Sequence, residues 1–546
     1  MRLLLVSFTP AQVQCFEELG CEVHVLNPPP ESETDVAGHA RKQGIAPDLL
    51  IQREFLGPRR LLSGLDAMEC PTLFWSLDTH LNLFWQRHYA RLFDGVLTTQ
   101  SHLAPRMEAW GGPRVGVCPW SGWVQPAPPF SRRPREAGFV GRITPQRAAR
   151  ANLAELIQAR ERSEVAQNLK FQEMMAFYQD TRAVPNEAIL GEVNLRLFEA
   201  ASCGCLVLCQ DLGESQNGLF APGKEIEIYA DGLELSALLD RARRDPAWAE
   251  RMGRAARVRV ISEHLFEHRA RAMLDFGRGL AQARLLGRQA ERRLALAAFE
   301  LWRSDMCSGR PDPMEARLLR FTPDVDVSMA LLRLFMVSGQ QGKTRAAVEE
   351  LFTAPPGEGG GRAGLNLCCP MAALRLGRFE RARQFLLRQL KAEPPARRVQ
   401  SGDDVELLLA WARIMAGHHV LIRHGYPFNA GESLPATALE CLLEAHRLAP
   451  ANQEVLRRLD ALLAGVKGME YVRMGFVSWR TLHKRKDWRL GLSLGELNLK
   501  TFRLQQGLDE IALARLRAEQ AGQESRFMRA LEGRDSQGLL RAALKW

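Results

Sequence analysis

The fold is decided by the stretch from Gly191 to Leu208, which reads GEVNLRLFEAASCGCLVL. A loop of small and polar residues leads into a helix that we expect from about Asn194 to Ser202, and an apolar strand follows at residues 206–208. Short apolar strands that alternate with helices and are bounded by turn residues are typical of a parallel sheet. This stretch therefore predicts an α/β domain.

The same alternation extends outward from this stretch. Strands are expected near residues 137–141 and 182–184, and a helix from about Phe266 to Ala283 closes the pattern. In the first 130 residues, strands are expected at 3–7, 21–26, 48–52, 72–77, 95–98 and 115–118. Residues 125–136 are rich in proline and charge, which is the composition of a linker. Two doubly wound domains are therefore predicted, and such sheets bind ligands at the carboxyl ends of their strands.

From about residue 285 onward the sequence predicts helices without strands. Two segments, 373–394 and 438–450, resemble tetratricopeptide hairpins in their glycine, alanine and proline positions. The expected fold class is α/β, with two facing Rossmann-like domains followed by an all-α helical-repeat domain. The expected bounds are 1–130 and 137–284 for the Rossmann-like domains and 285–546 for the helical domain.

The composition is that of an ordinary globular protein, with 46% hydrophobic and 25% charged residues. The N-terminus lacks a signal-peptide pattern, and no run reaches the roughly 18 apolar residues that cross a membrane, so a cytoplasmic protein is expected. The eleven cysteines show no spacing typical of zinc ligands.

The net charge of +10 is concentrated near the C-terminus. Residues 471–546 hold 15 Lys/Arg and 8 Asp/Glu, a net charge of +7, and His483–Lys486 is the densest basic run. A basic face attracts nucleic acid, an anionic membrane or an acidic partner, and an ordinary solvated helix face has the same composition. No nucleic-acid-binding motif accompanies the charge, so a nucleic acid partner is not expected, and membrane contact is left open.

The helix start near Asn194 is suited to an anion. Free backbone N–H groups and the helix dipole attract phosphates, so the backbone of Asn194 and Leu195 would face a diphosphate. Arg196 would add a two-point contact. Glu199 lies one turn further on and could accept hydrogen bonds from both hydroxyls of a ribose, although Glu192 and Glu199 could equally be ordinary helix-surface residues.

The pattern Asn-x-Arg-x-Phe-Glu-Ala, followed by a small residue and glycine, resembles the C-terminal domain of the glycosyltransferase group 1 superfamily. The resemblance is greatest to its spore-maturation-protein branch, which has the two-domain GT-B fold. Phe139–Gly141 with Arg147, Leu219–Ile226 and Glu263–Arg269 resemble further segments of that branch. Residues 137–284 would then bind the sugar nucleotide, and residues 1–130 would form the acceptor side.

The resemblance implies roles for the matching residues. Glu199 is similar to the ribose-binding glutamate of the family, and Asn194 and Leu195 are similar to its phosphate-facing backbone. The other expected donor-binding residues are Gly141, Arg142, Arg147, Tyr178, Asn186, Glu192 and Arg196. Arg142 and Arg147 would stabilise the charge of the leaving diphosphate.

Six residues lie between Glu192 and Glu199, whereas seven separate the glutamate pair that is common in the superfamily. This departure leaves open whether transfer retains or inverts the configuration of the sugar. An inverting enzyme needs a base on the acceptor side. Asp78 and His80 follow an expected strand and are the candidates, whereas a simple cap on the following helix is the alternative for Asp78.

The predicted function is the transfer of a sugar from a nucleotide-sugar donor, with a UDP-sugar as first choice, to a hydroxyl acceptor by a metal-independent hexosyltransferase. No cofactor and no metal are expected. The concave surface of a helical repeat suits a polypeptide, so the expected acceptor is a protein, such as flagellin or another surface protein. The alternatives are a lipid-linked glycan or polysaccharide acceptor, and a non-catalytic scaffold with a degenerate transferase module.

Overall fold

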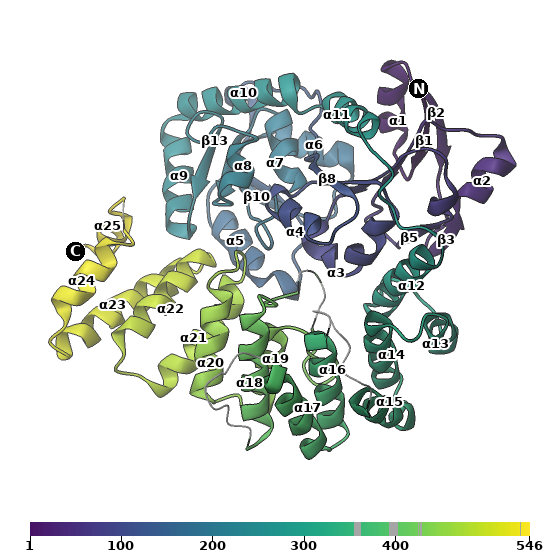
Figure 1. The fold of residues 1–546 in the computed structure, drawn as a ribbon. Coiled ribbons are helices and arrows are strands. Elements are labelled where there is room, and N and C mark those ends of the chain that lie inside the picture. The colour runs from purple at the N-terminus through teal and green to yellow at the C-terminus, as the bar shows by residue number, and fades with distance from the viewer. Residues whose placement is uncertain (354–361, 393–401, 424, 426–427, 536) are drawn as a thin grey trace. The chain divides into compact units, whose positions relative to one another are not determined.

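The computed structural model of the 546-residue chain describes all residues except 354–361, 393–401, 424, 426–427 and 536. The chain forms two compact units (Figure 1). The first unit contains residues 1–118 and 271–455, and the second contains residues 119–270 and 456–546. Each unit therefore combines a parallel sheet with part of the helical region.

The sheet of the first unit has six parallel strands in the order β2-β1-β4-β6-β7-β8. Its strands are β1 (Arg2–Val6), β2 (Glu22–Leu26), β4 (Leu49–Arg53), β6 (Thr72–Ser76), β7 (Gly95–Thr98) and β8 (Arg114–Val117). A small parallel pair, β3 (Ser32–Asp35) and β5 (Arg60–Ser63), lies outside it. The helices of this part are α1 (Pro10–Glu18), α2 (Val36–Gln43), α3 (Thr79–Tyr89) and α4 (Ala104–Glu108).

The sheet of the second unit has five parallel strands in the order β10-β9-β11-β12-β13. Its strands are β9 (Arg135–Val140), β10 (Ser163–Ala166), β11 (Thr181–Asn186), β12 (Leu206–Gln210) and β13 (Ile226–Tyr229). Its helices are α5 (Ala148–Gln158), α6 (Phe171–Gln179), α7 (Leu195–Ser202), α8 (Glu214–Asn217), α9 (Gly232–Arg244) and α10 (Pro246–Glu263). Helix α11 (Phe266–Arg278) begins in the second unit and ends in the first.

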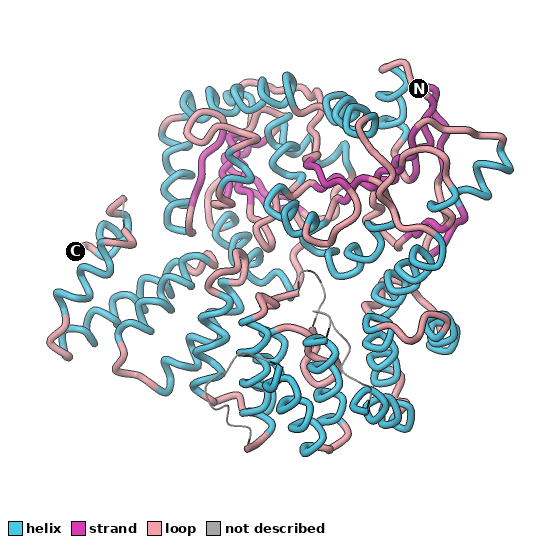
Figure 2. The backbone as a smooth tube through the Cα atoms, in the orientation of Figure 1, coloured by secondary structure: helices cyan, strands magenta, loops and turns pink. Residues whose placement is uncertain are grey.

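In the described part of the chain after β13, Figure 2 shows helices and loops only. In the first unit they are α12 (Gly287–Arg303), α13 (Pro311–Leu319), α14 (Val325–Val337), α15 (Gln341–Thr353), α16 (Arg362–Arg375), α17 (Phe379–Ala392), α18 (Asp404–Gly417) and α19 (Ala438–Leu448). Helix α20 (Gln453–Leu463) spans the boundary between the units. The second unit adds α21 (Glu470–His483), α22 (Trp488–Lys500), α23 (Leu504–Gln520), α24 (Glu524–Glu532) and α25 (Leu539–Leu544).

The helical region shares hydrophobic cores with the sheets. Leu294 and Leu301 of α12 are buried together with Phe74 of β6 and Trp85 of α3. In the second unit Phe502, just after α22, is buried with residues of the five-stranded sheet and its helices. Burial of these large side chains fastens the helices to the sheets, because removing apolar area from water is the main stabilising force in folding.

The structure confirms the expected fold class of parallel-sheet α/β domains with a large helical C-terminal region. The domain bounds 1–130, 137–284 and 285–546, and the tetratricopeptide character of the helices, stay predictions. The proline-rich segment 125–136 differs from the expected linker, because Phe130 and Arg133 are buried. Arg133 donates hydrogen bonds to the carbonyl oxygens of Thr181 and Cys203, both at 2.7 Å. The described helices include none with the length and apolarity that a bilayer crossing requires.

Candidate functional site

In the second sheet the chain first moves outward from β9 to β10, then returns past β9 to β11 and continues to β12. The direction of the strand order therefore reverses between β9 and β11. In open parallel sheets, ligands bind outside the carboxyl ends of the strands at such a switch point. Gly141 directly follows β9, and Asn186 is the last residue of β11. Both expected donor-site residues therefore lie where the topology favours a ligand.

Helix α7 begins beside this point and is open at its start. Its N-cap residue, Asn194, makes no side-chain capping bond, since Asn194 Nδ2 instead donates to the Glu187 carbonyl oxygen at 3.0 Å. Asn194 Oδ1 is buried and lacks a hydrogen-bond partner among the described residues. Leu195 is the first helical residue and is half-buried. The backbone N–H groups of the first turn are thus left without a side-chain cap, as an anion site requires.

Glu199 lies one turn into α7 and is 7% exposed. Within the described ranges, its carboxylate makes neither a hydrogen bond nor an ion pair. Burial raises the pKa of Glu199 to about 7, and the nearby positive charge of Arg196 opposes this effect. A nearly buried carboxylate without a partner is unfavourable, because desolvation of the charge is not compensated. A ligand that supplies hydrogen-bond donors to this carboxylate would compensate for its desolvation.

Arg196 is 9% exposed and is held mainly by the protein itself. Its Nε donates to the Val140 carbonyl oxygen at 2.9 Å, and its Nη1 donates to Asn186 Oδ1 at 3.1 Å and to the Glu187 carbonyl oxygen at 3.2 Å. Its guanidinium lies 4.3 Å from the centre of the Phe139 ring. The two-point phosphate contact expected of Arg196 is therefore restricted to Nη2, and its first role is to join β9, β11 and α7.

Gly141 keeps the remaining nitrogen of Arg196 accessible. A Cβ atom at residue 141 would lie 2.8 Å from Arg196 Nη2 and 2.9 Å from the Phe139 ring. Contacts this short do not occur without a shift of the neighbouring atoms. The glycine therefore allows a close approach of backbone, guanidinium and ligand at the end of β9.

A buried ion pair that the sequence analysis missed supports this site. Arg150 of α5 and Glu187, directly after β11, are 2% and 6% exposed, and Arg150 Nη2 lies 2.6 Å from Glu187 Oε2. Arg150 Nη1 also donates to the Arg142 carbonyl oxygen at 3.2 Å. Glu187 thus fixes the loop after β9 through its side chain and the start of α7 through its carbonyl group. A charged residue directly after a buried strand is the signal that points to it.

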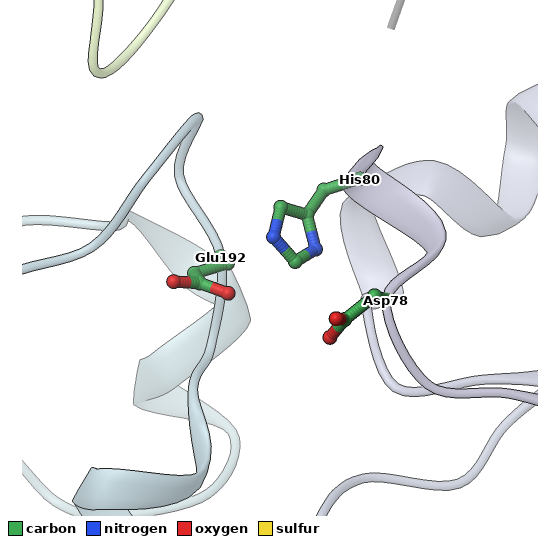
Figure 3. A group of neighbouring side chains, drawn as sticks. All are labelled: Asp78, His80 and Glu192. Carbon is green, nitrogen blue, oxygen red and sulfur yellow. The ribbon is translucent and has the colours of Figure 1, made fainter. Parts of the chain in front are cut away.

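The remaining expected donor residues occupy different environments. The Arg142 side chain is exposed, and Arg147 is the half-buried N-cap residue of α5. Tyr178 is fully buried in the core next to α7, and burial together with the Glu199 charge holds its pKa well above the usual value. Glu192, whose side chain is drawn in Figure 3, is half-buried on the loop before α7. Its carboxylate accepts from the Ile189 N–H at 3.5 Å. Among the expected donor residues, Asn186 and Arg196 share a hydrogen bond, and Asn194 is linked to them through the Glu187 carbonyl oxygen. Gly141 lies close to Arg196 without a bond to it.

In the first unit, Asp78 and His80 lie at the start of α3, and their side chains extend from the same end of this helix (Figure 3). Asp78 is the N-cap residue but makes no side-chain capping bond. His80 is 1% exposed. Asp78 thus occupies the N-cap position without the side-chain bond that a capping residue usually makes, and its role as a base stays a prediction.

Glu54, after β4, organises the start of α3. Glu54 Oε2 accepts from the backbone N–H groups of Leu77 and Asp78 at 2.7 and 3.0 Å. Glu54 Oε1 accepts from Asn82 Nδ2 at 2.7 Å. Glu54 is 2% exposed and fixes the loop that carries both candidate bases, a role that sequence reasoning did not assign.

Residues 140–275 match the model of a family described as glycosyl transferase-like. This part of the chain is thus similar to a glycosyl transferase-like domain. The matched range begins at the end of β9 and contains Gly141, Asn186, Asn194, Arg196 and Glu199. The hydrogen-bonded residues at the switch point therefore lie inside the matched range.

Three solved structures are similar to the chain. Sucrose-phosphate synthase from Thermosynechococcus elongatus is 13% identical with a TM-score of 0.37, and the match covers 51% of this chain and 98% of that one. A glycosyltransferase from Rickettsia africae is 10% identical with a TM-score of 0.39, over 51% and 97% of the two chains. HepE of Anabaena, in complex with UDP and glucose, is 12% identical with a TM-score of 0.36, over 51% and 100%. The search of curated proteins gave no match.

Proposed function

We propose that this protein transfers a sugar from a nucleoside diphosphate sugar to a hydroxyl acceptor. The observation that carries the proposal is Glu199, a nearly buried carboxylate without a partner in the described part of the chain, one turn after the open start of α7. The match of residues 140–275 to a glycosyl transferase-like family supports it. A UDP-sugar is the proposed first choice of donor.

In this proposal the diphosphate lies at the start of α7 and the ribose lies against Glu199. Two ribose hydroxyls donate to the carboxylate and favour its ionised form, which offsets the burial that raises its pKa. The N–H groups of α7 and Arg196 Nη2, with the exposed guanidinium of Arg142, stabilise the negative charge that develops on the leaving diphosphate. These groups supply the positive charge without a metal.

Asp78 and His80 are the proposed bases that accept the proton of the attacking hydroxyl. The start of α3 that carries them is fixed by Glu54, which keeps both side chains in a defined position. Preorganised placement of this kind lowers the entropic part of an activation barrier. Whether the configuration is inverted follows from the anomeric form of the product.

A protein acceptor is proposed because the helical region reaches the start of α3 within the first unit. Gly425 lies so close to Leu81 that a Cβ atom at residue 425 would overlap the Leu81 carbonyl group. Three residues earlier, the Ile422 carbonyl oxygen accepts from Arg106 Nη2 of α4 at 3.2 Å. Ile422 and Gly425, in the connection between α18 and α19, therefore contact α4 and α3, and α3 begins at the two candidate bases. A polypeptide bound to the neighbouring helices would be presented there.

The test measures release of nucleoside diphosphate from UDP-, GDP-, dTDP- and CMP-sugars, together with nucleotide binding by calorimetry. We expect one nucleotide class to bind and Glu199→Ala to abolish turnover. The control Glu155→Ala removes an exposed carboxylate of α5 in the same domain and should leave both unchanged. Full activity of Glu199→Ala would refute the assignment of the donor site.

A further inference from the structure

Helix α21 presents an apolar face to solvent. Its large exposed side chains are Tyr471, Val472, Trp479 and Leu482, which are 42%, 43%, 44% and 58% exposed. At 100° per residue, these four residues with Gly475 and His483 fill one sector of about 120° on the helix. No carboxylate, lysine or arginine is among the exposed residues of α21 in the described second unit.

The charged residues of α21 point the other way, toward the protein. Arg473 Nη2 lies 3.0 Å from Asp460 Oδ1, and Arg480 Nη1 lies 2.7 Å from Asp460 Oδ2. The side chains of Met474 and Val477 pack against α22. A surface helix of a globular protein normally turns its charges outward and its apolar residues inward. The outward face of α21 is therefore not explained by the packing of this chain.

A basic run directly follows this face. His483, Lys484, Arg485 and Lys486 are all exposed, and the charged groups of Lys484–Lys486 have no ion-pair partner within the described ranges. The neighbouring Asp487 caps α22, where its Oδ1 accepts from the Arg489 N–H at 3.1 Å. The exposed aromatic and aliphatic side chains thus lie next to unneutralised positive charge.

We propose that α21 and residues 484–486 form a docking surface for an anionic lipid bilayer. Trp479 and Leu482 would enter the boundary between headgroups and acyl chains, where tryptophan is favoured. Lys484, Arg485 and Lys486 would bind the acidic headgroups, since each basic residue near such a surface adds attraction. The helix would lie in the plane of the interface and not cross it.

Charge favours a bilayer over a second copy of this chain. A symmetric contact between two α21 faces would place two copies of the 484–486 run in the same interface, because such a contact uses the same patch on both partners. Neither copy would supply an acidic partner to this run, because no carboxylate is among the exposed residues that the structure describes in α21. An anionic surface instead complements both parts of the patch at once.

The test is flotation of the full-length protein with vesicles of phosphatidylcholine alone and of phosphatidylcholine mixed with phosphatidylglycerol. We expect flotation with the anionic vesicles only, and its loss at high salt, because ions screen surface charges. The variants Trp479→Ser/Leu482→Ser and Lys484→Ser/Arg485→Ser/Lys486→Ser should each lower binding by about tenfold or more. These measurements do not use catalysis, so they are independent of the proposed function.

Two matched controls accompany these variants. Leu513→Ser/Leu516→Ser removes exposed leucines of α23, and Arg243→Ser/Arg244→Ser removes exposed charges of α9, both within the second unit. Both should float like the wild type. Absence of flotation by the wild type would overturn the proposal. Unchanged flotation of the α21 variants, or a wild-type dimer that the Trp479→Ser/Leu482→Ser change dissociates, would overturn it as well.

Discussion

Asn186 Oδ1 accepts a hydrogen bond of 3.1 Å from Arg196 Nη1, which joins the carboxyl end of β11 to the first turn of α7. Both side chains are buried, so the bond is protected from competing water. The position of the α7 start relative to the sheet is therefore set before any ligand binds. The resemblance implied that Asn186 and Arg196 each contact the donor. In the structure they bind one another and fix the start of α7.

The pKa of Glu199 predicts a pH dependence of stability. Its value is about 7 in the folded protein, against 4.5 for an ordinary glutamate. Between these values the folded protein keeps a proton that the unfolded chain has released. The unfolding free energy should therefore fall by about 3 kcal/mol as pH rises through this window. Glu199→Gln should lack this component, which denaturant unfolding of both proteins across the pH range measures. Parallel curves for the two proteins would contradict the burial argument.

Gly141→Ala should weaken nucleotide binding. The new methyl group meets Arg196 Nη2 and the Phe139 ring, so the guanidinium must move away from the α7 start. We expect about a tenfold loss of affinity and a loss of about 1–3 kcal/mol of stability from overpacking. Calorimetric titration with the nucleotide and denaturant unfolding test both. The control Gly342→Ala adds a methyl group that meets no atom within 4 Å, so it should weaken neither nucleotide binding nor stability.

Breaking the Arg150–Glu187 pair should destabilise the protein strongly. Arg150→Met leaves the buried Glu187 carboxylate without its counter-charge, and we expect a loss of about 3–5 kcal/mol. The double variant Arg150→Met/Glu187→Leu should recover much of that loss, since neither charge is then buried. A double-mutant cycle by chemical denaturation measures the coupling, and additive effects of the two substitutions would show that the pair is not coupled.

Gly425→Ala tests the link between the helices and the start of α3. Its φ of +91° and its contact with Leu81 both disfavour a side chain at this residue. We expect a decrease in transfer rate of about tenfold or more with unchanged donor binding, because misplacement at the reacting end affects catalysis. Gly417→Ala, which meets no atom within 4 Å, is the matched control. Equal transfer rates for the two variants would show that the contact at Gly425 plays no part in presenting the acceptor.

Local patterns were sufficient to predict the central strands and the helix from Asn194, because buried parallel strands are short, apolar and bounded by turns. The strands β10 and β13 went unpredicted, since SEVA and IEIY carry charged residues within the strand. The segment 125–136 was misinterpreted because prolines are typical of linkers, whereas Arg133 uses its guanidinium to bond distant carbonyl groups. Those partners are 48 and 70 residues away, beyond the reach of a local pattern.

Within the site, the sequence correctly indicated a helix start and a carboxylate one turn later. It did not indicate that Arg196 donates hydrogen bonds to Val140, Asn186 and Glu187, because these contacts depend on how β9 and β11 are placed in the sheet. Glu54 was missed for the same reason, since its partners follow a neighbouring strand. Side-chain roles of this kind follow from tertiary neighbours and not from spacing along the chain.

The division of the chain has a consequence for dissecting the protein. The backbone passes from one compact unit to the other after Cys118, again after Ala270 and a third time after Val455. A single proteolytic cut at any of these three connections would leave the two units covalently joined by the other two. A fragment of residues 1–284 would also lack Leu294 and Leu301, which belong to the hydrophobic core of the first sheet. Neither unit can therefore be obtained as one uninterrupted fragment, and genetic dissection requires that its two segments be fused through a linker or expressed together as separate pieces.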